Sequence, residues 1–229
     1  MCPHCRRELA ARDLVPVFSW LALRGKCRHC RIPISLQYPV VELAGGLIFA
    51  VFYLFWPTNL GGAGELLLFV SWLLTSIGLL ALLVYDFRWM LLPNKILYPT
   101  LLATAAGRLG YILFYSDNKA HGLWLLTLSI AVASGIFWLI YLVSSGKWIG
   151  YGDVRLGLVT GTLLATPAMS LLMIFVASVI GTLFALPSLL AGRRAMTAKI
   201  PFGPFLIAAT FLVLLFGQSA INWYQNLLI

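Results

Sequence analysis

The sequence predicts an all-α protein, a polytopic bundle of about seven transmembrane helices that follows a small polar module. Hydrophobic residues make up 61% of the 229 residues and charged residues only 10%, whereas a typical soluble domain is about 25% charged. The mean hydropathy is +0.94, and the apolar residues fall into runs long enough to cross a bilayer. A water-soluble globule could not hide this much apolar surface.

Residues 1–37 form the predicted polar module, and residues 38–229 form the predicted membrane domain. The module holds seven of the sixteen Lys and Arg residues and all four cysteines. The apolar runs that follow predict spans near 39–57, 66–85, 96–115, 122–143, 154–168, 170–190 and 203–219. The short break at 166–169 predicts that the fifth and sixth spans form a tight helical hairpin.

The basic residues predict how the bundle is oriented, because loops rich in Lys and Arg stay in the cytoplasm. This rule places the amino-terminal module and the segments 86–95, 144–155 and 191–200 inside, and the loops 58–65 and 116–121 outside. The net charge of +9 does not indicate nucleic acid as a partner. The basic residues cluster at the ends of apolar runs and do not alternate with aromatic residues as in proteins that follow a nucleic-acid strand.

All four cysteines lie in two C-x2-C pairs, formed by Cys2 with Cys5 and by Cys27 with Cys30. Each pair can present two thiolates to one ion, and four thiolates complete a closed tetrahedral site for a structural zinc. Two disulfides are the alternative, which the reducing cytoplasm disfavours. The module is too short to fold on a hydrophobic core alone, and metal binding would supply the missing free energy.

Two of the seven acidic residues lie where a charge is unfavourable, at the edges of apolar runs. Asp86 closes the run 79–86, and Asp153 opens the run that follows it. Charged residues within membrane spans are rare and usually functional. Two predicted crossings separate these acids, so both should return to the cytoplasmic face. We interpret them as the pair of an aspartyl peptidase, in which one carboxylate activates water and the other polarises the scissile carbonyl.

Each acid also has a plainer interpretation. Asp86 could be a solvated residue at a helix end, and Asp153 could be the N-cap of a helix that begins at Val154, because Asp is favoured there. A transporter could use the same two acids to relay protons or to bind a cation. A non-enzymatic membrane assembly protein could instead use the zinc module to dock its partners.

The residues around the two acids favour the catalytic interpretation. Gly150 and Gly152 lead directly into Asp153, and glycines permit an unusual backbone and close helix approach. Pro93 and Asn94 follow Asp86 in a second irregular segment on the same predicted face. Irregular backbone at membrane depth is tolerated where it lines a wet cavity.

Several segments together carry a resemblance to a known family. They are the two cysteine pairs, the segments 19–27 and 34–43, Asp86 with the downstream segment 92–94, the G-x-G-D sequence at 150–153 with the residues 154–156 that follow it, and the segment 200–205. The G-x-G-D sequence alone also occurs in presenilin-like and signal-peptide-peptidase enzymes, but the combination is specific. The chain resembles, nearly end to end, the type IV prepilin peptidases, which are bifunctional leader peptidase/N-methyltransferases of the bacterial inner membrane.

The resemblance implies an activity and the residues that perform it. Enzymes of this kind cut the basic leader from prepilins and pseudopilins after a glycine, and then methylate the new amino terminus with S-adenosylmethionine. They serve type IV pilus or type II secretion systems. The resemblance makes Asp86 and Asp153 the catalytic pair, and makes Gly25, Lys26 and Glu42 candidates for binding S-adenosylmethionine.

The resemblance also implies partners and a location. The expected partners are prepilin or pseudopilin precursors and the lipid bilayer, and the amino terminus and the active site should face the cytoplasm. Typical members carry a further span before the cysteines, whereas this sequence begins directly with the cysteine module. We expect the peptidase pair not to depend on that span.

Overall fold

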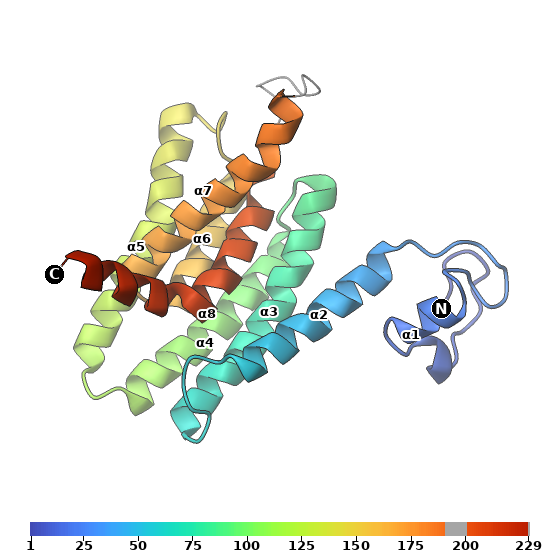
Figure 1. Ribbon diagram of the computed structural model, residues 1–229, viewed down its shortest axis with the longest axis horizontal. Helices are drawn as coiled ribbons and strands as arrows, with labels where there is room; N and C mark the ends of the chain where they lie inside the picture. The colour runs from blue at the N-terminus through green and yellow to red at the C-terminus, as the bar shows by residue number, and fades with distance from the viewer. Residues whose placement is uncertain (191–200, 229) are drawn as a thin grey trace. The chain divides into compact units, whose positions relative to one another are not determined.

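The computed structural model describes residues 1–190 and 201–228, and in these ranges the chain forms helices joined by loops (Figure 1). These ranges contain no strand, only an isolated bridge between Lys26 and Pro33. The chain divides into two compact units, Met1–Phe55 and Trp56–Ile229. The basic residues of the segment 191–200, which contribute to the predicted orientation, lie outside the described residues.

The first unit contains the cysteine loops, two short helices and one long helix. The short helices are the 3-10 helix η1 (Ala11–Asp13) and the helix α1 (Phe18–Ala22). The long helix α2 spans Gln37–Leu54. It begins where the predicted polar module ends, and it is long and apolar enough to cross a membrane.

The second unit is a bundle of antiparallel helices. Its helices are α3 (Ala63–Trp89), α4 (Asn94–Tyr115), α5 (Lys119–Ser144), α6 (Tyr151–Leu164), α7 (Pro167–Leu190) and α8 (Gly203–Leu228). The most extensive packing joins α3 to α4, α5 to α6 and α7 to α8. The helix α6 also packs against α4, α7 and α8, and Figure 1 shows it within the bundle.

Six helices of the described chain, namely α2, α3, α4, α5, α7 and α8, are long and apolar enough to span a membrane. This agrees approximately with the prediction of about seven crossings. The exception is α6, whose 14 residues extend over about 21 Å, less than the roughly 30 Å of the hydrocarbon core. The predicted span 154–168 ends early because Ala165 is left-handed (φ 56°) and Pro167 begins the next helix.

Small residues allow α6 to lie within the bundle. Ten of its 14 residues are buried. A Cβ atom at Gly157 would lie 2.7 Å from the carbonyl oxygen of Ala133, and one at Gly161 would lie 2.9 Å from the Cα of Ile130. Glycines four residues apart therefore bring the backbones of α5 and α6 into contact, a common mode of helix association in membranes.

Polar and small side chains also join α3 to α4. The hydroxyl groups of Thr75 and Thr104 lie 2.9 Å apart and are buried. The side chain of Thr100 occupies the space that a Cβ atom at Gly78 would need. The two helices are consequently in close contact along their length.

Candidate active site

Asp86 lies one turn before the end of α3, and its side chain is only 6% exposed. The helix ends after it because Met90 adopts a left-handed conformation (φ 52°) and donates its N–H to the carbonyl oxygen of Asp86. The carboxylate of Asp86 accepts a hydrogen bond from the backbone amide of Gly203. Asp86 is thus a buried residue with a defined partner and not a solvated helix end.

Asp153 is the third residue of α6 and is 9% exposed. The helix begins at Tyr151, because Gly150 before it is extended (φ −78°, ψ 148°). The interpretation of Asp153 as the N-cap of a helix starting at Val154 is therefore wrong. Its carboxylate instead lies beside the residue that precedes the helix, since a Cβ atom at Gly150 would be 3.7 Å from Oδ2 of Asp153.

The carboxylates of Asp86 and Asp153 meet at Gly203, the first residue of α8. A Cβ atom at Gly203 would overlap Oδ2 of Asp86 and would lie 3.6 Å from Oδ1 of Asp153. Both carboxylates therefore lie within 4 Å of one point. The structure brings together the two acids that the sequence singles out, although 66 positions separate them in the chain.

Two helix amino termini point toward this pair of acids. Asp153 lies in the first turn of α6, and Asp86 accepts the amide of the first residue of α8. A helix amino terminus carries a partial positive charge of about half a unit, which stabilises a nearby anion. These two termini offset part of the free-energy cost of burying a carboxylate at this position.

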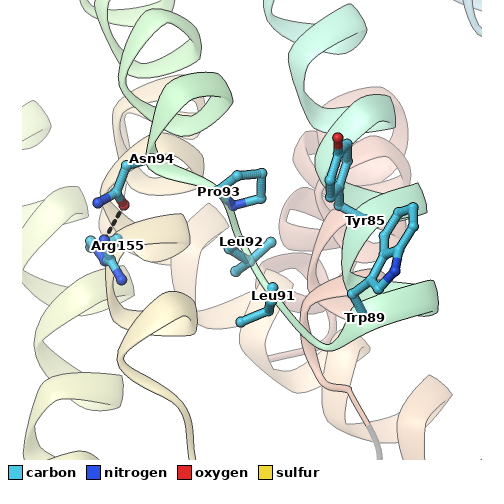
Figure 2. Close-up of a pocket in the computed structure, with 7 residues that line it drawn as sticks. All are labelled: Tyr85, Trp89, Leu91, Leu92, Pro93, Asn94 and Arg155. Atoms are coloured by element: carbon cyan, nitrogen blue, oxygen red, sulfur yellow. Dashed lines mark hydrogen bonds between the residues drawn. The ribbon is translucent and has the colours of Figure 1, made fainter.

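The loop between α3 and α4 lies against the start of α6. A Cβ atom at Gly152 would lie 3.1 Å from Cδ1 of Leu92, so glycine permits this close approach. Pro93 is extended (ψ 129°), and its carbonyl accepts the amides of Ile96 and Leu97 in the first turn of α4. An open cavity of about 480 Å³ lies here, between the aromatic rings of Tyr85 and Trp89 and the loop (Figure 2).

The four cysteines are held in two loops with the same backbone hydrogen bonds. The amide of Cys2 donates to Arg7 and that of Cys27 donates to Ile32, and each cysteine carbonyl accepts the amide four residues later. The residues that donate these last bonds, Arg6 and Arg31, are both left-handed. The two C-x2-C pairs thus form equivalent knuckles.

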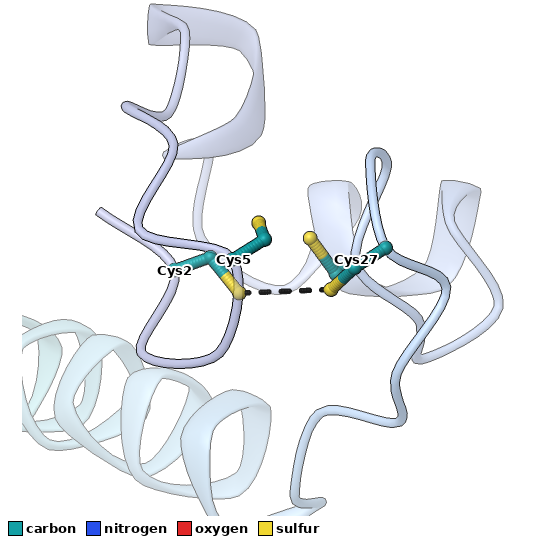
Figure 3. Close-up of side chains that lie close together, drawn as sticks. Cys2, Cys5 and Cys27 are labelled. Atoms are coloured by element: carbon teal, nitrogen blue, oxygen red, sulfur yellow. Dashed lines mark hydrogen bonds between the residues drawn. The ribbon is translucent and has the colours of Figure 1, made fainter.

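The positions of the sulfur atoms fit a zinc ion. All four lie within 4.8 Å of one another, and Figure 3 shows the side chains of Cys2, Cys5 and Cys27 among them. The Sγ atoms of Cys2 and Cys30 are 3.9 Å apart. Tetrahedral zinc with Zn–S bonds of about 2.3 Å places its sulfur ligands about 3.8 Å apart. The amides of Cys5 and His4 lower the pKa of the Cys2 thiol to about 6, whereas burial and the neighbouring cysteines raise the pKa of the Cys30 thiol to about 11, so a metal would have to displace a proton from Cys30.

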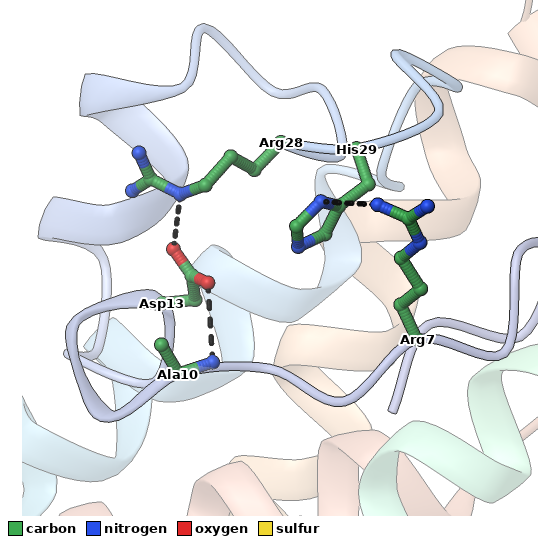
Figure 4. A network of polar contacts seen from close by, with 5 residues as sticks. All are labelled: Arg7, Ala10, Asp13, Arg28 and His29. Atoms are coloured by element: carbon green, nitrogen blue, oxygen red, sulfur yellow. Dashed lines mark hydrogen bonds and ion pairs between the residues drawn. The ribbon is translucent and has the colours of Figure 1, made fainter.

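Polar contacts join the two knuckles and the helix η1 (Figure 4). The Nε of Arg28 lies 2.7 Å from Oδ1 of Asp13, and the guanidinium lowers the pKa of that carboxyl. The amide of Ala10 donates to the other carboxylate oxygen of Asp13. The guanidinium of Arg7 donates to Nδ1 of His29 at 3.4 Å. His29, which lies inside a knuckle, therefore uses its ring to connect the two loops.

A second cavity of about 480 Å³ lies within the first unit. Residues of the cysteine loops, α1 and α2 line it, among them Trp20, Tyr38 and Glu42. The carboxylate of Glu42 accepts the amide of Val17 at 2.8 Å. Val17 is left-handed (φ 62°), which is unusual for a β-branched residue and often marks a functional segment.

The three residues that the resemblance associates with S-adenosylmethionine differ in position. Glu42 lines this cavity, whereas Gly25 and Lys26 do not. Gly25 is left-handed (φ 68°), and a Cβ atom there would lie 2.8 Å from the ring of Trp20. The indole N–H of Trp20 donates to the carbonyl of Ile34 at 3.2 Å. Gly25 therefore allows the Trp20 ring to take its place in the cavity wall.

Comparison with known proteins identifies the family. Residues 1–56 match the family model of the bacterial peptidase A24 N-terminal domain, and residues 73–186 match that of the type IV leader peptidase family. A prepilin leader peptidase/N-methyltransferase from Stutzerimonas stutzeri is 34% identical over 219 residues, which cover 95% of this chain and 72% of that protein. This chain belongs to the type IV leader peptidase family.

Other relatives of this leader peptidase carry the same name. The protein from Bacillus subtilis (strain 168) is 32% identical over 223 residues, which cover 97% of this chain and 84% of that protein. The protein from Aeromonas hydrophila is 31% identical over 224 residues, which cover 97% and 73%. No solved structure gives a significant match to the chain.

Gly203 lies at the acid pair, although the sequence alone did not predict it there. It belongs to the segment 200–205, which contributes to the family resemblance, but a glycine offers no reactive group to search for. The sequence feature that could have indicated its role is its position directly before an apolar run, between Phe202 and Pro204. Only the packing of α8 shows that it contacts Asp86.

Proposed function

We propose that this enzyme is a membrane aspartyl peptidase that uses Asp86 and Asp153 to cut the leader from prepilin or pseudopilin precursors, after a glycine, and that it also methylates the new amino terminus. The observation that carries the proposal is the meeting of two buried carboxylates at Gly203. The names of the relatives support both reactions. The transporter and assembly-protein interpretations are not favoured, because the family is one of peptidases.

The geometry supports hydrolysis by a pair of acids that share one proton. Two carboxylates this close do not both ionise easily, so one is an anion while the other keeps its proton. The anion accepts a proton from water, whose oxygen forms a bond to the carbonyl carbon of the substrate. The protonated acid donates a hydrogen bond to the carbonyl oxygen. The C–N bond then breaks as the proton passes to the leaving amine.

The distribution of charge supports a cytoplasmic active site. The helix ends and loops next to the acid pair carry Arg88, Lys95 and Lys147, whereas the opposite end of the bundle carries Asp117 before α5 and Lys119 at its start. The positive-inside rule places the more basic end in the cytoplasm. We propose that the enzyme lies in the inner membrane in this orientation, where the basic leader of a precursor would meet the pair.

Replacement of Gly203 by alanine is expected to reduce leader cleavage by about 10²-fold or more, because the new methyl group would displace the Asp86 carboxylate. The control is Gly217→Ala, a change further along α8. It would displace the side chains of Met169 and Val213 and should mainly affect the stability of the folded protein. The rate per folded molecule should separate the two variants. Full activity of Gly203→Ala would show that the position of Asp86 is not critical.

The cavity of the first unit supports the second reaction. We propose that it binds S-adenosylmethionine, which supplies an electrophilic methyl group when bound. The Trp20 ring can stack against a cation, and Glu42 provides a carboxylate for hydrogen bonding or charge pairing. Both residues line the cavity. Gly25 and Lys26 contribute through the loop that supports Trp20.

We propose that the four cysteines bind a structural zinc ion. Four thiolates fill a tetrahedral shell, so no position stays open for a substrate. The role of the metal would be to fix the two knuckles, which also form part of the cavity wall through Cys2 and Cys27.

The experiment that tests both reactions uses purified protein, a prepilin and S-adenosylmethionine labelled in its methyl group. Loss of the leader and transfer of the label are scored separately. We expect Glu42→Gln to lower label transfer by at least about 10-fold while leader cleavage stays unchanged. Glu8→Gln, a change of an exposed acid outside the cavity wall, serves as the control. Equal label transfer by wild type and Glu42→Gln would exclude this cavity as the methyl-donor site.

A further inference from the structure

The helix α6 ends inside the bundle, and two side chains satisfy its last carbonyls. Arg108 donates to the carbonyl oxygen of Leu163. The hydroxyl of Ser129 donates to the carbonyl oxygen of Gly161 at 2.8 Å, which also accepts the amide of Ala165. The Gly161 carbonyl thus has a backbone partner as well, whereas the Leu163 carbonyl, like the other last carbonyls of a helix, has none within it and cannot turn to water in a membrane.

Arg108 is an unusual residue for this task. It lies in the middle of α4, a candidate membrane span, and charged residues at such depth are rare and usually functional. Glu65 and Tyr111 lie near enough to interact with it electrostatically, and the Tyr111 hydroxyl donates to Glu65. An acidic residue, Glu65, therefore lies near Arg108 at the end of the bundle opposite the acid pair.

A second contact joins α4 to α6 next to the acid pair. Arg155, two residues after Asp153, donates to Oδ1 of Asn94, the first residue of α4 (Figure 2). Its guanidinium also lies 5.0 Å from the centre of the Tyr151 ring. The helix α4 thus holds α6 near both of its ends, through Asn94 at one end and Arg108 at the other.

The same helix is joined to α3, which carries Asp86. The buried hydroxyl pair of Thr75 and Thr104 and the contact of Thr100 with Gly78 connect α3 to α4. A continuous series of packed elements therefore connects the two acids, from α3 through α4 to α6. Since a helix of 14 residues behaves as a short rod, a shift at its carboxyl end moves its amino end as well.

We propose that Arg108, Asn94 and Arg155 are positioning residues for the peptidase reaction. Through the contact of Arg108 with Leu163 and the contact of Asn94 with Arg155, α4 holds α6 at two points and keeps Asp153 beside Asp86. We call these two contacts the clamp. This inference rests on the proposed peptidase function. None of the three residues needs to touch the substrate bond, because each acts through the position of Asp153.

The test compares variants at both points of the clamp. Arg108→Met removes the donor to Leu163 and is expected to lower kcat for leader cleavage by about 10²-fold with little change in KM, because a misplacement of about 1 Å has an effect of this size. Arg155→Met is expected to lower kcat about 10-fold, and Arg155→Lys, which keeps a donor, should recover part of the loss. Lys119→Met removes an exposed cation at the start of α5 and should behave like wild type.

Two measurements separate positioning from stability. A change in the spacing of two interacting acids alters the pH profile of cleavage, whereas a loss of stability alone lowers the folded fraction and leaves the profile unchanged. If Arg108→Met does not fold, the variants of Arg155, which is half-buried, still decide the question. Wild-type kcat and an unchanged pH profile for Arg155→Met and for folded Arg108→Met would overturn the proposal.

A cross-linking readout does not depend on activity. A Cβ atom at Gly152 would lie 3.4 Å from the Cβ of Leu92, close to the spacing of about 3.8 Å in a disulfide. Cysteines introduced at these two positions should cross-link readily on oxidation, and Arg108→Met should slow the reaction several-fold. If Arg108→Met does not change the cross-linking rate, the clamp is contradicted, whether or not the protein cleaves a prepilin. If Arg108→Met slows cross-linking but the protein has no peptidase activity, only the proposed function is contradicted.

Discussion

Asp86→Asn and Asp153→Asn are each expected to reduce leader cleavage by at least about 10³-fold. An amide cannot take the proton from water, and it cannot hold the single proton that the pair shares, so the loss reaches the full contribution of general acid–base catalysis. Because the two acids act as one unit, the double variant should be no less active than either single variant. Cleavage is measured with purified enzyme and a prepilin, per folded molecule.

Asp117→Asn is the matched control, since it makes the same chemical change in an exposed loop residue at the opposite end of the bundle. Its activity should equal that of wild type. All variants should be present at similar levels in the membrane and should still methylate a substrate that is already cleaved. Leader cleavage that survives either substitution in the pair would contradict the proposed mechanism.

Cys27→Ser is expected to weaken zinc binding at least about 100-fold and to abolish methyl transfer while leader cleavage continues. The loss of one thiolate opens the metal site, and small modules of this kind do not stay folded without their metal. Cleavage should continue because Asp86 and Asp153 belong to the other compact unit. Metal content, measured on the purified protein, should fall from about one zinc per chain.

His29→Ala provides the control for the metal site. The four sulfur atoms lie close enough together to complete a tetrahedral shell around one ion, so this variant should keep its zinc and lose only the contact with Arg7. Treatment of wild type with a strong chelator should reproduce the Cys27→Ser result. Zinc content unaffected by Cys27→Ser, or lost in His29→Ala, would show that the ligand set differs from the four cysteines.

The proximity of Asp86 and Asp153 could be predicted from the sequence, because a carboxylate is costly at the edge of an apolar run and two such residues return to the same predicted face. Each acid alone has an ordinary interpretation, but the two together, with the glycines before Asp153 and the irregular segment after Asp86, favour a common site. The all-helical membrane fold followed from hydropathy in the same way. The four-cysteine cluster followed from spacing alone, because two C-x2-C pairs need only fold together to surround one ion.

Features that depend on close packing could not be predicted in this way. Gly203 contacts both acids, but a missing side chain leaves no chemical signal in the sequence. The sequence of α6 predicts a membrane span, but the helix is shorter than a bilayer-spanning helix because it begins after Gly150 and ends before Ala165. Arg108 lies inside a predicted span, and its partner is a backbone carbonyl that no sequence pattern marks.

The turn of two residues between α6 and α7 has a consequence for biogenesis. With Asp153, Arg155 and several glycines, α6 would not partition from the translocon into lipid alone, because each charged residue opposes insertion. The strongly apolar α7 can carry it in as one hairpin. Nascent chains stalled before α7 emerges should therefore leave α6 outside the bilayer, where quality-control proteases can reach it. Asp86 and Asp153 would then come together only at a late stage of synthesis.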